Sequence, residues 1–173
     1  MIHAKIAKIN YICVMDIRVG YGYDVHALAS LLPLIICGVK IEHEKGCIAH
    51  SDGDVAIHAL CDAILGAMGE RDIGYHFPDT STEYKGIDSR LLLERVNLMM
   101  KNKGYRIGNL DITIALQRPK IAPYIDSMRQ SLSDVLEIEK DRISVKATTT
   151  EKLGFVGKEE GVEASAVVLI VKE

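Results

Sequence analysis

Apolar side chains recur at intervals of three and four residues in three segments of the chain, which predicts three amphipathic helices. The first segment covers residues 51–69, where Ser51 followed three residues later by Asp54 is typical of a capping box and Gly69 ends the apolar stripe. The second and third helices are predicted at residues 91–104 and 121–136.

Apolar and polar residues alternate in other parts of the chain, which predicts strands between and around the helices. The expected strands cover residues 16–26, 105–116, 143–147 and 162–171, with a short hairpin at 34–41. Helices and strands intermix without an internal repeat. We therefore expect an α/β or α+β sandwich, with a mixed sheet of four to five strands and helices packed on one face.

Residues 72–88 follow neither period and are rich in Gly, Pro, Asp, Ser and Thr. A connection of this length without regular structure is uncommon inside a compact domain. We expect it to be a functional loop.

Composition narrows the class of protein. The chain has 173 residues, a normal length for one domain, and its 48% apolar and 26% charged residues are ordinary for a globular protein. A net charge of -3 argues against binding to nucleic acid or to an anionic membrane surface. No apolar run is long enough to span a bilayer, so we expect a soluble protein.

Cysteine spacing and the first residues give two smaller expectations. Cys13, Cys37, Cys47 and Cys61 form neither a Cys-x-x-Cys pair nor a dense disulfide pattern, so we expect reduced thiols. Residues 1–14 are interpreted either as a disordered extension or as the product of an upstream start codon, and residues 15–173 as the single domain.

Three side chains form a candidate metal site. Asp24 and His26 are one residue apart in the first expected strand, so both lie on one face. His58 lies among apolar residues of the first helix, where a lone histidine is usually a core residue. One carboxylate and two imidazoles suit zinc or a related divalent transition metal and leave a position open. Asp54 or Asp62, four residues either side of His58, is expected to orient its second ring nitrogen, unless both acids lie on a solvated helix face.

Two further segments combine hydroxyl groups with charges. Residues 49–54 place an imidazole, a hydroxyl and carboxylates at a helix N-terminus, which suits phosphate, although an ordinary helix cap explains them equally well. Residues 147–152 contain three threonines, an acid and a base after a strand, which suits phosphate and Mg²⁺ but is also typical of a strand alone. The sequence contains no Walker A, dinucleotide-binding or nucleophile-elbow motif.

Five motifs, in this order, resemble those of the 2-C-methyl-D-erythritol 2,4-cyclodiphosphate synthase family: Asp24-Val25-His26, His50-Ser51-Asp52-Gly53-Asp54, His58, Phe77-Pro78-Asp79-Thr80 and Lys146-Ala147-Thr148-Thr149-Thr150-Glu151-Lys152-Leu153-Gly154-Phe155. The resemblance extends over residues 17–172. It implies a homotrimer around a central β-lined core, with active sites between subunits. It also implies an enzyme of the non-mevalonate isoprenoid route, which cyclises 4-diphosphocytidyl-2-C-methyl-D-erythritol 2-phosphate and releases CMP.

The resemblance also implies roles for individual residues. Asp24, His26 and His58 match zinc ligands, and Glu151 matches the acid that binds Mg²⁺ or Mn²⁺ between the substrate phosphates. The residues expected at the reacting groups are His50, Asp79 and Thr149. The expected substrate-binding residues are Ser51, Asp72, Gly74, Lys120, Ile121, Ala122, Thr148, Thr149, Phe155 and Lys158.

Tyr21 and Lys158 depart from the family pattern, because many members carry histidine and arginine there, in groups that line a central cavity of the trimer. Glu160, which belongs to the same region, is kept. The two changes argue against an anionic isoprenoid ligand in such a cavity.

Two rival functions fit parts of the same pattern. A zinc-dependent hydrolase would use the three metal ligands to activate water, and a trimeric module could bind a nucleotide or an isoprenoid phosphate without catalysis. The expected location is the cytoplasm of a bacterium, or a plastid-type organelle if the source is eukaryotic.

Overall fold

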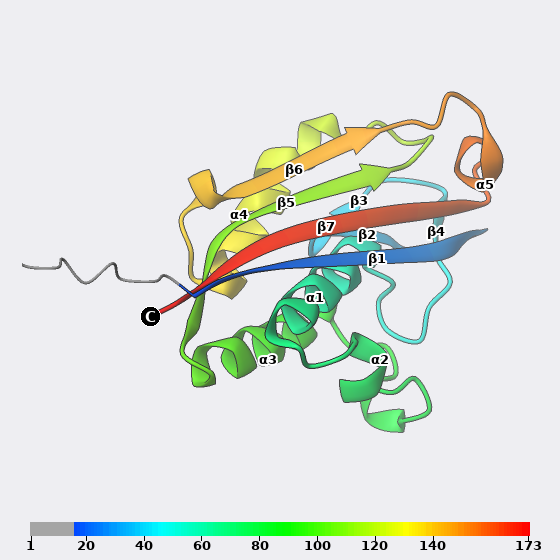
Figure 1. Ribbon diagram of the computed structural model, residues 1–173. Coiled ribbons are helices and arrows are strands. Elements are labelled where there is room, and N and C mark those ends of the chain that lie inside the picture. The colour runs from blue at the N-terminus through cyan, green and yellow to red at the C-terminus, as the bar shows by residue number, and fades with distance from the viewer. Residues whose placement is uncertain (1–15) are drawn as a thin grey trace, which may run out of the picture.

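The computed structural model describes residues 16–173, so the expected extension at residues 1–14 lies outside the described part. A five-stranded sheet has the order β4-β1-β7-β5-β6, and a separate two-stranded sheet pairs β2 with β3 (Figure 1). The strands are β1 (Ile17–Ser30), β2 (Leu34–Ile36), β3 (Val39–Ile41), β4 (Lys45–Cys47), β5 (Tyr105–Ala115), β6 (Ile143–Thr148) and β7 (Gly161–Lys172). Only the β5–β6 pair of the large sheet is parallel, which confirms the mixed sheet.

The longer helices cover one face of this sheet, as expected (Figure 1). The α-helices are α1 (Val55–Met68), α2 (Ile73–His76), α3 (Ser89–Asn102), α4 (Ile125–Leu136) and α5 (Gly154–Gly157), and short 3₁₀ turns occupy Thr82–Tyr84, Ala122–Tyr124 and Lys140–Arg142. Helix α1 lies between the sheet and α3, and its Ile57, Leu60 and Ile64 are fully buried. Within residues 16–173, no helix has the length and apolar character that crossing a membrane requires.

Glycine brings α1 unusually close to β1. Gly20 and Gly22 point from the strand toward the helix, and a Cβ atom on either would lie within 2 Å of the carbonyl oxygens of Ala63 and Ala59, respectively. The two backbones therefore pack directly against each other. Asp24 follows Gly22 on the same face of β1, so the glycines determine how far the ligands on the strand lie from those on the helix.

Three local expectations were incomplete or wrong. Asp54, not Ser51, caps α1, because its carboxylate accepts the backbone N–H of Ile57. The segment at residues 72–88 contains α2 and a 3₁₀ turn, because local side-chain caps such as Asp72 stabilise turns too short to show a period. Strand β4 and helix α5 went unpredicted for the same reason, since three or four residues carry no readable periodicity.

Candidate active site

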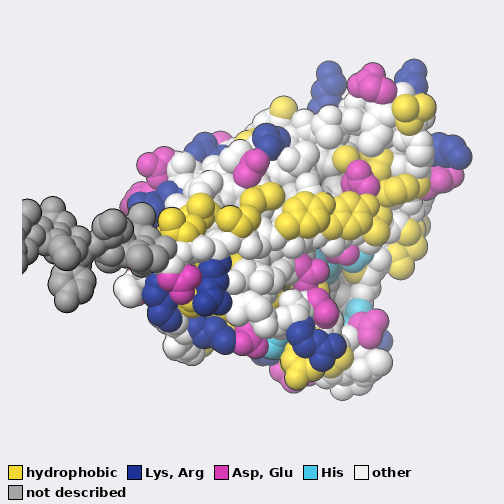
Figure 2. Space-filling view, viewed as in Figure 1, with side chains coloured by type: hydrophobic (Ala, Val, Ile, Leu, Met, Phe, Trp, Pro, Cys, Tyr) yellow, Lys and Arg dark blue, Asp and Glu magenta, His cyan; other side chains and the backbone are white. Residues whose placement is uncertain are grey.

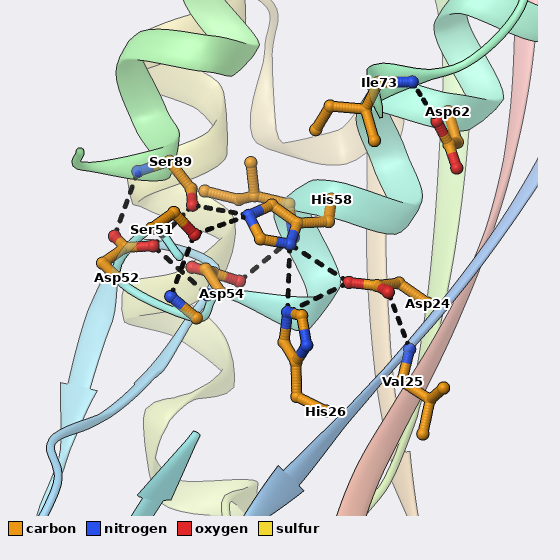
Figure 3. A network of polar contacts seen from close by, with 12 residues as sticks. Asp24, Val25, His26, Ser51, Asp52, Asp54, His58, Asp62, Ile73 and Ser89 are labelled. Carbon is orange, nitrogen blue, oxygen red and sulfur yellow. Dashed lines mark hydrogen bonds and ion pairs between the residues drawn. The ribbon is translucent and has the colours of Figure 1, made fainter. Parts of the chain in front are cut away.

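Three ligand atoms from two elements converge at one point on the helix side of the sheet (Figure 3). Oδ2 of Asp24 lies 3.2 Å from Nε2 of His26 and 3.1 Å from Nδ1 of His58, and the two nitrogens are 3.1 Å apart. A tetrahedral zinc ion with ligands about 2.0–2.2 Å away would hold its ligand atoms about 3.3–3.5 Å apart. The triangle is therefore almost the size that such an ion needs, and the residues fit the metal that the sequence predicts.

The surrounding backbone fixes the direction of the ligands on β1. The other carboxylate oxygen of Asp24, Oδ1, accepts the N–H of Val25 at 2.8 Å, which leaves Oδ2 facing the two rings. His26 follows on the same face of the strand, and His58 faces it from the first turn of α1. Within residues 16–173, this is the one group of three histidine, cysteine or acidic side chains whose ligand atoms come this close.

The protonation of the two histidines depends on burial and on Asp24. Burial lowers the pKa of His26, which favours the neutral ring that a metal requires. Burial also acts to lower the pKa of His58, but the adjacent Asp24 carboxylate outweighs it and raises this pKa. A proton and a metal ion therefore compete for His58 beside the same carboxylate.

The second ring nitrogen of His58 contacts hydroxyl groups, so the expectation for Asp54 or Asp62 is wrong. Nε2 lies 3.1 Å from Oγ of Ser51 and 3.0 Å from Oγ of Ser89. The Asp62 carboxylate instead accepts the N–H of Ile73.

Asp54 is fully buried and accepts three backbone N–H groups, from Cys37, Gly38 and Ile57. Asp54 and Asp62 therefore both bind backbone N–H groups near the site. Sequence spacing places them near His58 but cannot show that their carboxylates face the backbone.

A pocket of about 340 Å³ opens beside the metal ligands. His26 and His58 form part of its wall, together with the expected residues His50, Ser51, Gly74 and Asp79. Its apolar wall, which the sequence pattern did not predict, consists of Ile73, Phe77, Tyr84, Ile87 and Leu92. The segment at residues 72–88 thus supplies much of a binding surface.

Two residues expected to contact the substrate, His50 and Asp72, have hydrogen bonds within the protein. Nε2 of His50 lies 3.0 Å from the carbonyl oxygen of Ser81, so this nitrogen carries the proton and donates it. Asp72 caps α2 by accepting the N–H of Tyr75 and does not line the pocket, although Gly74 does.

The residues expected to bind the nucleotide gather in a second, smaller hollow of about 190 Å³. Its lining includes Lys120, Ile121, Ala122, Thr148 and Thr149. None of the residues that line the metal pocket lines this hollow. Within one chain, the metal ligands and the expected nucleotide residues therefore line two separate hollows.

Three other expected residues, Glu151, Phe155 and Lys158, line neither of these two hollows. Glu151 is exposed, accepts the Thr149 hydroxyl at 2.9 Å and does not belong to the metal triangle. Phe155 and Lys158, on and just after α5, line neither pocket. A larger hollow, about 470 Å³ between α3 and α4, is lined by none of the expected site residues.

Comparison with known proteins shows the family to which the chain belongs. The YgbB family matches residues 17–171. A protein of Pseudoalteromonas atlantica is 54% identical over 91% of this chain and 98% of its own length. One of Photobacterium profundum is 58% identical over 88% and 98%, respectively. Both relatives are named 2-C-methyl-D-erythritol 2,4-cyclodiphosphate synthase.

Solved structures share the fold. The bifunctional IspDF protein of Campylobacter jejuni superimposes with a TM-score of 0.89 at 40% identity over 92% of this chain, which spans 43% of that longer protein. IspF of Plasmodium falciparum, solved as a CDP complex, superimposes with a TM-score of 0.80 at 38% identity. That match covers 91% of this chain and 97% of the other.

Proposed function

The chain belongs to the YgbB family, and we propose that it converts 4-diphosphocytidyl-2-C-methyl-D-erythritol 2-phosphate into 2-C-methyl-D-erythritol 2,4-cyclodiphosphate and CMP. It is an enzyme of isoprenoid biosynthesis. The observation that carries the proposal is the Asp24-His26-His58 triangle opening into a pocket that has one polar and one apolar wall.

The chemistry of the pocket suits the methylerythritol phosphate part of this substrate. A branched polyol phosphate has an apolar methyl group, hydroxyls and a charged end. Phe77 and Tyr84 pack edge to face, 5.5 Å between ring centres, and present a rigid apolar wall to the carbon skeleton. Asp79 is assigned to a substrate hydroxyl, since an unpaired carboxylate would repel a phosphate.

Charge repulsion is the main obstacle to the reaction, because one phosphate must attack the phosphorus of a second group that is also negative. Zinc bound at the triangle supplies positive charge and a fixed coordination position there. No protein nucleophile is needed, since the attacking and leaving groups belong to one molecule held in line. Nε2 of His50 already donates to Ser81, so His50 is assigned as a phosphate donor through Nδ1 in its doubly protonated form, in which both ring nitrogens donate.

We propose that the nucleotide hollow of a neighbouring copy completes the site, since the two hollows of one chain share no lining residue. We assign Lys120, Ile121, Ala122, Thr148 and Thr149 to the cytidine diphosphate, and relatives solved with CDP support a nucleotide ligand. Glu151, beside Thr149, is assigned to the second ion, Mg²⁺ or Mn²⁺, together with the substrate phosphates. Asp72, Phe155 and Lys158 remain proposed substrate contacts.

An exposed apolar face supports assembly into a homotrimer. The side of β1 away from the helices carries Ile17, Val19, Tyr21, Tyr23 and Val25, each at least 44% exposed. Figure 2 shows apolar side chains in a continuous row along this part of the sheet. A continuous apolar row on a sheet face is typical of a subunit interface. We place the enzyme in the bacterial cytoplasm, or in a plastid-type organelle in a eukaryote.

The products distinguish this proposal from the two rivals. The purified chain is incubated with zinc, Mg²⁺ and the diphosphocytidyl substrate, and ³¹P NMR follows the phosphorus atoms. Cyclic diphosphate and CMP in equal amounts are expected. Hydrolysed, open-chain products would indicate the hydrolase, and binding without turnover would indicate the binding module.

A further inference from the structure

His58 has two hydroxyl partners at its second ring nitrogen, and the structure distinguishes them (Figure 3). Ser89, the first residue of α3, is fully buried. Ser51 is partly exposed and lines the substrate pocket. The two hydroxyls lie at nearly equal distances from Nε2, so distance alone does not show which one controls the ring.

Hydrogen-bond direction separates the two hydroxyls. Oγ of Ser89 lies 2.5 Å from Oδ1 of Asp52, and an ionised carboxylate can only accept, so the Ser89 hydroxyl donates its proton to Asp52. The lone pairs of the Ser89 oxygen then remain available to accept a hydrogen bond from His58. Oγ of Ser51 accepts the N–H of Gly53, and within residues 16–173 no carboxylate accepts the proton of the Ser51 hydroxyl.

Asp52 is itself held in place. Its Oδ2 accepts the backbone N–H of Ser89 at 3.0 Å, and its Oδ1 also accepts the backbone N–H of Asp54 at 3.2 Å. The Asp52 carboxylate therefore accepts hydrogen bonds from both the hydroxyl and the backbone N–H of Ser89. This double contact fixes the N-terminus of α3 against the loop before α1.

We propose that Asp52 and Ser89 are positioning residues that hold His58 in its metal-binding form. A metal on Nδ1 requires the proton of the neutral ring to be on Nε2, and the Ser89 oxygen accepts the hydrogen bond from that N–H in a fixed direction. The sequence of donors is His58 Nε2–H to Ser89 Oγ–H to the Asp52 carboxylate. Ser51 keeps its hydroxyl proton free for the substrate. This inference rests on the proposed metal site and assigns a role to two residues outside the metal triangle.

Zinc affinity of the full chain tests the assignment, measured by competition with a chromogenic chelator. Ser89→Ala removes the acceptor and is expected to weaken zinc binding about 10- to 100-fold, as is typical when the partner of a ligating histidine is lost. The matched control Ser51→Ala is expected to stay within about threefold of the wild type in zinc affinity while raising KM. Asp52→Asn, which keeps the buried Ser89, is expected to weaken zinc binding as Ser89→Ala does.

Ring ¹⁵N NMR of the zinc-loaded protein gives a second readout that a purely structural role would not change. The Nε2–H signal of His58 should be sharp and slow to exchange in the wild type and in Ser51→Ala, and shifted or lost in Ser89→Ala. Wild-type affinity in both Ser89→Ala and Asp52→Asn would overturn the inference and leave the metal site standing. Equal zinc binding by the wild type and His58→Ala would instead reject the metal site itself.

Discussion

Gly22→Ala should disrupt the metal site without touching a ligand. The new Cβ would lie 1.9 Å from the carbonyl oxygen of Ala59, whereas an ordinary carbon–oxygen contact needs about 3.3 Å. Helix α1 would have to move away from β1 by about 1.4 Å, several times the deviation of about 0.2 Å that a metal–ligand distance tolerates. Overpacking of this kind costs about 1–3 kcal/mol of folding free energy. His58 moves with the helix, so zinc affinity should fall as well.

Urea unfolding and zinc competition measure the two effects separately. Gly66→Ala is the matched control, because it lies on the same helix and its new Cβ would be 4.0 Å from the nearest heavy atom outside the surrounding helix backbone, the carbonyl oxygen of Tyr21. It should leave zinc binding unchanged and raise stability by up to about 1 kcal/mol, since glycine disfavours a helix interior. If Gly22→Ala kept wild-type stability and zinc affinity, the direct packing of the two backbones would not determine the metal geometry.

Three further outcomes follow from the core and the site. Leu93→Ala in the fully buried part of α3 should lower the unfolding free energy in urea by about 2–5 kcal/mol; a loss below 1 kcal/mol would contradict its tight packing. Burial raises the pKa of Asp54 to about 6, so its ionisation in the native state opposes folding. Relative to Asp54→Asn, the wild type should lose up to about 3 kcal/mol of stability between pH 4 and pH 7, and a constant difference would refute this. Adding zinc at 100 times its dissociation constant to the metal-free wild type should raise its unfolding free energy by about 2.7 kcal/mol and leave that of His58→Ala unchanged. An equal increase in both proteins would place the ion elsewhere.

The sign of the Asp54 effect follows from the two states of the carboxyl group. Its pKa is near the ordinary value of 3.8 in the unfolded chain and about 6 in the folded one. The folded state therefore binds the proton more tightly. This contribution to stability is fully present below pH 3.8 and is lost as the pH rises through 6.

Sequence patterns predicted the fold class and the Asp24-His26 part of the candidate metal site, because both depend on short-range regularity. The period of a strand places Asp24 and His26 on one face, and the family motifs add His58 on the facing helix. The hairpin at residues 34–41 was also correct, since Cys37-Gly38 both adopt positive φ in its turn.

What the sequence could not show depends on contacts between distant segments. Ser89 contacts His58 although the two residues are 31 positions apart in the chain. Nothing in the sequence distinguishes Ser89 from an ordinary serine at a helix start. The apolar wall at Phe77 and Tyr84 forms only when short capped turns fold over α1. The separation of metal pocket and nucleotide hollow likewise depends on the order of strands in the sheet.

Mixing two inactive variants tests most directly whether the active site is built from two chains. His58→Ala removes the metal half of the proposed site and Thr149→Val removes the nucleotide half, so each variant alone should be inactive. Random co-assembly of equal amounts pairs two intact halves in about one quarter of the sites, by the statistics of a cyclic trimer. CMP release at about one quarter of the wild-type rate per site is therefore expected. No recovery in mixtures that mass spectrometry shows to be co-assembled would contradict a site shared between subunits.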